Sequence, residues 1–243
     1  MINYAHRGAS EYSPENTLSS FYLGLIQGAN GIETDVRRTK DGELVLFHDS
    51  KLSRVTDGDG LLAEHTLAEL KKLRVYGNST NTFYDRIPTY REFLEHFASY
   101  DIRFAIELKA EDIEADVLRL SKEFGILEKT TFTSSHFDYL KKLKALEPSA
   151  RIGWLLGWKV DEIPSEDVER LLSIGGEEIC PIENLTTEES VASWRRSGLG
   201  VRAWGIKDTA AMKRMCALGV DGMTVNFPDR LHEYLNTVLE VKR

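Results

Sequence analysis

Residues 31–49, Gly-Ile-Glu-Thr-Asp-Val-Arg-Arg-Thr-Lys-Asp-Gly-Glu-Leu-Val-Leu-Phe-His-Asp, contain the pattern from which the fold can be worked out. The apolar-rich run Gly31–Val36 is typical of a strand. It is followed by Thr39–Glu43, a turn with Asp-Gly at its centre, and then by Leu44–His48. Asp-Gly between two such runs predicts a hairpin, so Leu44–His48 is expected to return antiparallel as an extra strand.

Short runs rich in Val, Ile and aromatic residues alternate with longer amphipathic stretches along the rest of the chain. This rhythm is typical of repeated βα units around a parallel sheet. The predicted barrel strands are Asn3–His6, Gly31–Val36, Arg103–Leu108, Thr130–Thr133, Arg151–Leu155, Glu178–Pro181, Val201–Gly205 and Gly222–Val225. Eight strands predict a closed (β/α)₈ TIM barrel, because an open doubly wound sheet usually has fewer.

Helix-capping signals support this count. Ser13 and Pro14 place a capping hydroxyl and a first-turn proline before a helix predicted over Glu15–Gln27, which Gly28 ends. The other predicted helices are Thr89–Ala98, Asp112–Phe124, Phe137–Leu146, Ser165–Ser173, Thr187–Arg195, Asp208–Ala217 and Arg230–Val238.

The chain length fits one barrel. With 243 residues, residues 1–243 match the roughly 250 residues of a typical α/β barrel, and we expect a single domain. Residues 49–88 interrupt the repeat after the second barrel strand and its hairpin, with one short helix predicted over Thr66–Leu73. So long an insertion at the end of a barrel strand predicts a small cap over the active-site face.

Composition restricts the class of function. There are 31 Lys and Arg against 39 Asp and Glu, so the formal net charge is −8, which argues against nucleic acid or anionic lipid as a partner. No apolar run approaches membrane-span length and no leader opens the chain, so we expect no stable membrane insertion and a cytoplasmic location. Cys180 and Cys216 lie in apolar runs, which favours a reducing compartment. A monomer and a homodimer both remain open.

Three carboxylates are expected to meet at one end of the barrel. Glu33 and Asp35 are two residues apart on one strand, so their side chains share a face, and Glu107 lies near the end of the next barrel strand. Crowded buried carboxylates need a counter-ion. Hard oxygen ligands favour Mg²⁺ or Ca²⁺ over structural zinc. From spacing alone, surface salt bridges explain the same residues equally well.

Two histidines and two cations are predicted beside the carboxylates. His6 ends the first strand and His48 ends the hairpin strand, and such a pair can remove one proton and deliver another. A lone histidine favours a structural role, but two beside three carboxylates favour catalysis. Arg7 and Lys109 can grip phosphate oxygens, and carboxylate pairing is their alternative role.

The short motifs of the chain together resemble the glycerophosphodiester phosphodiesterase family. They are His6-Arg7-Gly8, Pro14-Glu15-Asn16-Thr17, Glu33-Thr34-Asp35-Val36, His48-Asp49, Glu107-Leu108-Lys109 and Asp221-Gly222. Each motif is weak by itself, but their order, their spacing and their places at strand ends make the set specific over nearly the whole chain.

The resemblance implies a metal-dependent TIM barrel that hydrolyses glycerophosphodiesters to sn-glycerol 3-phosphate and an alcohol. It implies Glu33, Asp35 and Glu107 as ligands of one divalent cation, Mg²⁺ or Ca²⁺, with Mn²⁺ as a further candidate. It also implies His6 and His48 as the acid/base pair, and Arg7 and Lys109 as phosphate contacts. Residues 49–88 resemble the insertion of the family.

The chain departs from the pattern of that family at three places. Trp204-Gly205-Ile206-Lys207 loses a hydroxyl and gains a cation, Asn226 stands where an aspartate is common, and His136 lies beside the expected Ser-Phe. None of these positions belongs to the predicted metal ligands or to the histidine pair. They leave the alcohol specificity open rather than the chemistry.

Two alternatives compete with this interpretation. A phospholipase acting on intact lipid needs an exposed apolar or basic surface, for which Trp154, Trp158, Phe83 and Tyr84 are the candidates. Core packing or lining of the pocket is the expected role of these aromatic residues. The second alternative is a barrel that binds a phosphorylated ligand without turnover.

Overall fold

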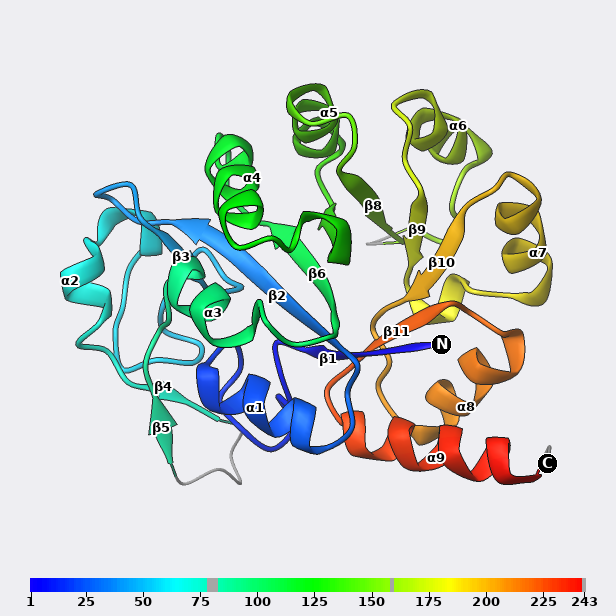
Figure 1. Cartoon of the computed structure of the whole chain (residues 1–243), viewed down its shortest axis with the longest axis horizontal. Coiled ribbons are helices and arrows are strands. Elements are labelled where there is room, and N and C mark those ends of the chain that lie inside the picture. The colour runs from blue at the N-terminus through cyan, green and yellow to red at the C-terminus, as the bar shows by residue number, and fades with distance from the viewer. Residues whose placement is uncertain (78–82, 158–159, 242–243) are drawn as a thin grey trace.

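Eight parallel strands form a closed barrel in the computed structural model, which describes residues 1–77, 83–157 and 160–241. Around the ring the order is β1, β11, β10, β9, β8, β7, β6 and β2, and β1 also pairs with β2, which closes the sheet. Figure 1 shows the strands at the centre of the molecule. The predicted (β/α)₈ barrel is confirmed. The strands are β1 Ile2–His6, β2 Gly31–Arg38, β6 Arg103–Leu108, β7 Thr130–Ser134, β8 Arg151–Leu156, β9 Glu178–Pro181, β10 Gly200–Ala203 and β11 Gly222–Val225.

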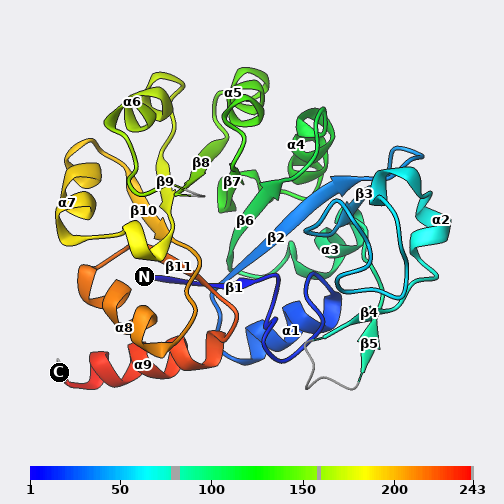
Figure 2. The same cartoon turned by 180° about the vertical axis from the view of Figure 1, so that it is seen from behind.

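Helices surround the strands, as both views show (Figures 1 and 2). They are α1 Leu18–Ile26, α3 Tyr90–Phe97, α4 Glu114–Glu123, α5 Phe137–Leu146, α6 Ser165–Ser173, α7 Glu188–Arg196, α8 Thr209–Leu218 and α9 Pro228–Val241. Two 3₁₀ turns, η2 Leu127–Lys129 and η3 Glu183–Leu185, precede β7 and α7. Apolar faces of these helices pack on the barrel in one large core, which includes Phe21, Phe93, Phe104 and Phe132.

The predicted start of the first helix is wrong. Thr17, not Ser13, caps α1, and its side chain accepts a hydrogen bond from the backbone N–H of Ser20. Asn16 adopts a φ of 56°, a left-handed conformation that cannot continue into a right-handed helix. Asp112, with a φ of 58°, delays the start of α4 to Glu114 for the same reason.

The seventh barrel strand is also shorter than predicted. It ends at Ala203, and the prediction extended it to Gly205. Trp204 makes only an isolated bridge to Ile182, and Gly205 adopts a φ of 74°, which ends the extended conformation. The remaining predicted strands and helices lie within three residues of those in the structure.

The insertion forms a layer beside the barrel (Figure 1). Strand β3, Leu44–Leu46, pairs antiparallel with β2, which confirms the extra strand, although His48 lies two residues beyond it. A 3₁₀ turn η1 (Leu62–Glu64) and helix α2 (Leu67–Leu70) follow. The predicted helix to Leu73 is too long, because Lys72 and Leu73 continue with tighter i→i+3 hydrogen bonds.

The insertion has a small core of its own, made by Val45, Phe47, Leu52, Leu62, Leu70, Val75 and Ile87. A short hairpin of β4 (Val75–Tyr76) and β5 (Tyr84–Asp85) was not predicted. The polar residues 78–82 between these strands lie outside the described residues.

The aromatic side chains divide between core and surface. Trp154 is 5% exposed and packs in the core, as expected. Phe83 and Tyr84 are 44% and 49% exposed, so the expectation that they pack inside is wrong, because the β4–β5 hairpin projects from the insertion. Trp158 lies outside the described residues. Among the described helices, none is both long and apolar enough to span a membrane.

An ion pair lies inside the barrel. Arg202 of β10 is 1% exposed, and its Nε donates to Oε2 of Glu178 on β9 at 3.0 Å. Its Nη1 donates to Oγ1 of Thr224 at 3.0 Å, and the guanidinium lies over the Tyr4 ring at 5.2 Å. Removing one partner of such a pair leaves a buried charge without compensation.

We predict that Glu178→Gln lowers the free energy of unfolding by about 3 kcal/mol, because Arg202 stays buried without its carboxylate. The matched control is Glu123→Gln, which breaks an exposed pair with Arg91 and should change the same quantity by less than about 1 kcal/mol. Urea unfolding measures both variants. Equal destabilisation of the two would contradict the structural role of the buried pair.

Candidate active site

Three neighbouring strands place the predicted residues side by side. In the register of the sheet, His6 on β1 is opposite Glu33 on β2, and Asp35 on β2 is opposite Glu107 on β6. His6 ends β1 and Glu107 is the penultimate residue of β6, and the register places Glu33 and Asp35 level with them. The cluster therefore lies at the carboxyl-terminal end of the barrel, where barrel enzymes carry their active sites. The alternation along β2 directs Glu33 and Asp35 to the same face.

The carboxylates of Glu33, Asp35 and Glu107 form one buried cluster. Each offers an oxygen within 4.8 Å of the others. Burial, together with the charge of Asp35, raises the pKa of Glu33 to about 8, and burial also raises the pKa of Glu107. Burial opposes ionisation of Asp35, but the charges of Arg7 and Lys109 outweigh it and lower the pKa of that carboxyl.

The cluster fits a divalent cation. Asp35 is fully buried, and its Oδ1 accepts no hydrogen bond from the described residues, since Nζ of Lys109 lies 3.6 Å away, beyond hydrogen-bond distance. A buried carboxylate oxygen without a donor is destabilising unless a cation contacts it. Three carboxylates without sulfur ligands are the donor set of a hard cation such as Mg²⁺ or Ca²⁺.

Arg7 and Lys109 pair with these carboxylates. Nε of Arg7 lies 3.2 Å from Oδ2 of Asp35, and its Nη1 donates to Oε1 of Glu15 at 3.0 Å. Nζ of Lys109 lies 2.7 Å from Oε1 of Glu107 and 3.6 Å from Oδ1 of Asp35. The carboxylate pairing weighed from the sequence is therefore present, and both cations also line the cavity described below.

Asn16 and Gly8 support the cluster. The Asn16 side chain donates to Oδ2 of Asp35 at 2.8 Å and accepts from Thr34 at 2.7 Å. Gly8 has a φ of 84°, and a Cβ there would lie 2.4 Å from the backbone carbon of Ser20. The sequence motifs contained both residues, but their roles depend on a left-handed backbone that spacing does not reveal.

His6 has a neutral partner. Its Nδ1 and Oδ1 of Asn226, which follows β11, lie 2.6 Å apart, so Nδ1 carries the proton. Nε2, which lies 3.9 Å from Oε2 of Glu33, is left to accept a proton. Burial and the charge of Arg7 lower the pKa of His6 to about 3. This histidine is therefore a neutral imidazole at ordinary pH.

His48 has an ionised partner. Its Nδ1 donates to Oδ1 of Asp49 at 2.7 Å. Arg54 and His48 outweigh burial and lower the pKa of Asp49, which keeps that carboxylate charged. The backbone carbonyl of His48 accepts from Nε and Nη2 of Arg37 at 2.9 and 2.7 Å. Asp49 was predicted only as part of a motif, and Arg37 was missed.

A cavity of about 370 Å³ opens above the cluster. All seven predicted site residues lie together, six of them in its wall, with Asp35 buried behind them. The lining residues are His6, Arg7, Glu33, His48, Glu107, Lys109, Thr133, Ser135, Leu155, Arg202, Trp204, Gly205 and Thr224.

Residues 6–230 match the model of the glycerophosphoryl diester phosphodiesterase family. The chain belongs to this family. The glycerophosphodiester phosphodiesterase of Caldanaerobacter subterraneus subsp. tengcongensis is 32% identical over 233 residues, which cover 93% of this chain and 94% of that protein. A Bacillus altitudinis protein of the same name is 32% identical over 241 residues, with 93% and 95% covered. The chain is therefore a phosphoric diester hydrolase.

Solved structures share its fold. A phosphodiesterase of Oleispira antarctica, in complex with its product sn-glycerol-3-phosphate, matches with a TM-score of 0.82 at 31% identity, covering 96% of both chains. A glycerophosphodiester phosphodiesterase of Agrobacterium tumefaciens matches with a TM-score of 0.83 at 26% identity, covering 96% of this chain and 100% of that one.

We predict that Mg²⁺ or Ca²⁺ raises the melting temperature of metal-stripped protein, because a cation relieves the repulsion within the cluster. When its free concentration is about a hundred times its dissociation constant, a ligand that binds only the folded state raises the free energy of unfolding by about 2.7 kcal/mol. Asp35→Asn should abolish the shift, whereas Asp116→Asn, a surface change on α4, should preserve it. If the melting temperature of Asp35→Asn still rose with the cation, the cation would bind elsewhere and the predicted site would be wrong.

Proposed function

We propose that this enzyme hydrolyses glycerophosphodiesters to sn-glycerol 3-phosphate and an alcohol, with one divalent cation and a histidine pair. The proposal rests on one observation, which is that the predicted groups line the same cavity. Its wall contains both histidines, two of the three clustered carboxylates, and Arg7 and Lys109. The product complex of the Oleispira antarctica relative supports the glycerol phosphate half of the substrate.

Glu33, Asp35 and Glu107 would hold the cation, with Mg²⁺ and Ca²⁺ as the proposed ions and Mn²⁺ as a further candidate. When bound, it supplies positive charge that stabilises the phosphate in the transition state. Arg7 and Lys109 add fixed positive charge at the cavity wall. Together these groups attract an anionic diester into a protein of net charge −8.

His6 is the proposed general base. A neutral imidazole with Nδ1–H held by Asn226 presents an unprotonated Nε2 to the cavity. That nitrogen takes the proton of the attacking hydroxyl as its oxygen bonds to phosphorus. Water is one candidate nucleophile. The 2-hydroxyl of the substrate is the other, and it would form a cyclic phosphate that water then opens.

His48 is the proposed general acid. Burial, together with the charges of Arg7 and Lys109, lowers the pKa of His48. The ionised Asp49, which accepts a hydrogen bond from Nδ1–H, opposes this shift and favours the imidazolium form that an acid requires. Nε2 gives its proton to the alcohol oxygen as the P–O bond breaks. The unequal hydrogen-bond partners of the two rings, an amide for Nδ1 of His6 and a carboxylate for Nδ1 of His48, support this assignment.

Intact phospholipid is a second candidate substrate, because the insertion exposes two aromatic side chains. Tyr84 lies on β5, and Phe83 directly precedes that strand. Arg74 and Arg86 stack on the Tyr84 ring at 5.5 and 5.4 Å, which adds basic groups to an aromatic surface. Turnover of phosphatidylcholine vesicles at the rate of glycerophosphocholine would favour this candidate.

We place the enzyme in the cytoplasm, since Cys180 and Cys216 are free thiols.

His6→Ala and His48→Ala should each lower kcat on glycerophosphocholine by roughly 10²–10⁴-fold, the usual effect of losing a general acid or base. His96→Ala is the matched control, because His96 is exposed on α3 and should retain wild-type turnover. Unfolding by denaturant checks that the variants fold. Wild-type turnover by both active-site variants would overturn the proposal.

A substrate with an activated leaving group separates the two roles. Glycerol p-nitrophenyl phosphate releases an anion that needs no proton, so it should restore much of the rate of His48→Ala and little of that of His6→Ala. The opposite pattern would exchange the roles of the two histidines.

A further inference from the structure

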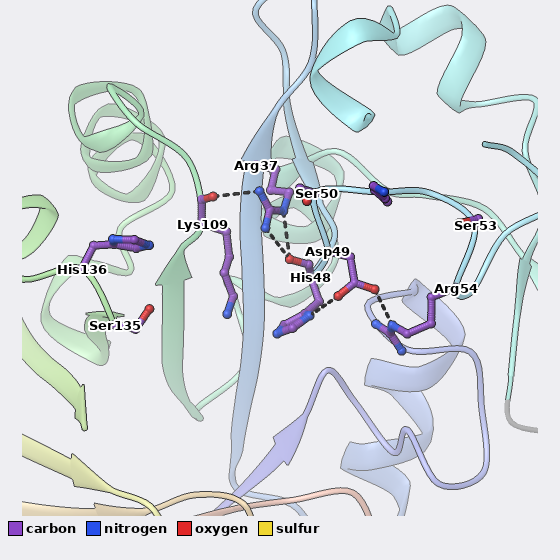
Figure 3. A pocket seen from close by; sticks show the side chains of 10 residues that line it. Arg37, His48, Asp49, Ser50, Ser53, Arg54, Lys109, Ser135 and His136 are labelled. Carbon is purple, nitrogen blue, oxygen red and sulfur yellow. Dashed lines mark hydrogen bonds and ion pairs between the residues drawn. The ribbon is translucent and has the colours of Figure 1, made fainter. Parts of the chain in front are cut away.

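A second hollow adjoins the catalytic cavity. It is a groove of about 560 Å³, within the range of about 300–1,000 Å³ typical of small-molecule sites. His48, Lys109 and Ser135 line both hollows. The insertion supplies one wall, and Ser135 with His136 supplies the other (Figure 3). The shared residues make the groove an extension of the catalytic cavity.

The groove is rich in positive charge. Arg37, Lys51, Arg54 and Lys109 line it, and Asp49 is the one carboxylate among the described lining residues. Asp49 is already engaged by His48 and Arg54, as the dashed lines of Figure 3 show. This charge excess stands out in a chain with a net charge of −8.

Two of these cations have no carboxylate partner among the described residues. Arg37 donates only to backbone carbonyls, those of His48 and Lys109, and these bonds use three of its five N–H groups. Lys51 is exposed and makes no ion pair with the described residues. Their charges are therefore available to a ligand in the groove.

His48 connects this charge to the chemistry. As the proposed general acid, it contacts the oxygen of the departing alcohol, and it lies in the wall of both hollows. In the proposed function the catalytic cavity holds the glycerol phosphate half and the cation, so the alcohol would extend past His48 into the groove.

We infer that the groove is the subsite of the leaving alcohol and selects alcohols that carry a further anionic group, a phosphate or a carboxylate. This inference rests on the proposed function. Arg37 and Lys51 are the specificity-determining residues. A cationic headgroup such as choline is disfavoured there, because no free carboxylate among the described lining residues faces it.

Two matched substrate pairs test the selection. Glycerophosphoinositol 4-phosphate and glycerophosphoinositol differ by one phosphate, and glycerophosphoserine and glycerophosphoethanolamine differ by one carboxylate. The anionic member of at least one pair should have a kcat/KM about five-fold higher, the effect of roughly one exposed ion pair. The pair that responds identifies the anion, and the ratio should fall with added salt.

Lys51→Gln should lower the ratio towards one, with the remainder due to Arg37, and should not lower stability, because Lys51 is exposed. Lys129→Gln is the matched control. It makes the same charge change in η2, ahead of β7 and so at the opposite end of the barrel, and should keep the wild-type ratio. Ratios of one in both wild-type pairs, or equal losses in the two variants, would overturn the inference.

Binding separates this inference from the proposed function. Calorimetric titration with inositol 4-phosphate and with inositol reports the groove without turnover, and only the phosphate should bind in a Lys51-dependent way. Hydrolysis of all four diesters without preference would contradict the anion-selective subsite and leave the proposed function intact. Selective binding without any hydrolysis contradicts the proposed function alone.

Discussion

The crowding of Glu33, Asp35 and Glu107 is the constraint on which the rest of the site depends. Three carboxylates within 4.8 Å of one another, all buried, repel each other strongly unless positive charge is close. Arg7 and Lys109 supply part of that charge, and Asn16 satisfies one oxygen of Asp35. The left-handed backbone at Gly8 and at Asn16, just before α1, places the side chains of Arg7 and Asn16 beside Asp35. In the proposed function a cation held at the remaining oxygens would complete the balance and supply the charge that phosphate chemistry needs.

The two histidines differ in what holds them, and this difference gives the site a direction. His6 is held by a neutral amide on the β11 side, whereas His48 is held by a carboxylate at the start of the insertion. In the proposed function a base on one side and an acid on the other would fix which P–O bond breaks. The departing alcohol would then lie towards the insertion, where the cationic groove lined by His48 begins. In the proposed function the chemistry would therefore draw on both the barrel and His48, which follows β3, and the specificity on both the insertion and Arg37 of β2.

Sequence was sufficient for the barrel and for the convergence of the seven predicted site residues at one cavity, because strand ends of a parallel barrel meet wherever the strands are identified. Their catalytic and metal-binding roles remain predictions. It was not sufficient for partners far apart in the chain, such as His6 with Asn226 and Arg202 with Glu178. It also missed Arg37, whose role is to hold two backbone carbonyls, an interaction without a sequence pattern. The predicted start of α1 was wrong because Asn16 has a left-handed backbone conformation. Its hydrogen bonds to Asp35 and Thr34 hold that conformation, and local helix signals do not reveal it.

The most direct test of this account is the release of sn-glycerol 3-phosphate from glycerophosphoinositol by metal-stripped protein, measured before and after addition of Mg²⁺, Ca²⁺ or Mn²⁺. The account predicts product only after a cation is added, since the buried carboxylates cannot accept an anionic diester beside them without it. Equal release by the stripped protein, with residual metal excluded by elemental analysis, would contradict it. No release with any of the three cations would contradict it as well.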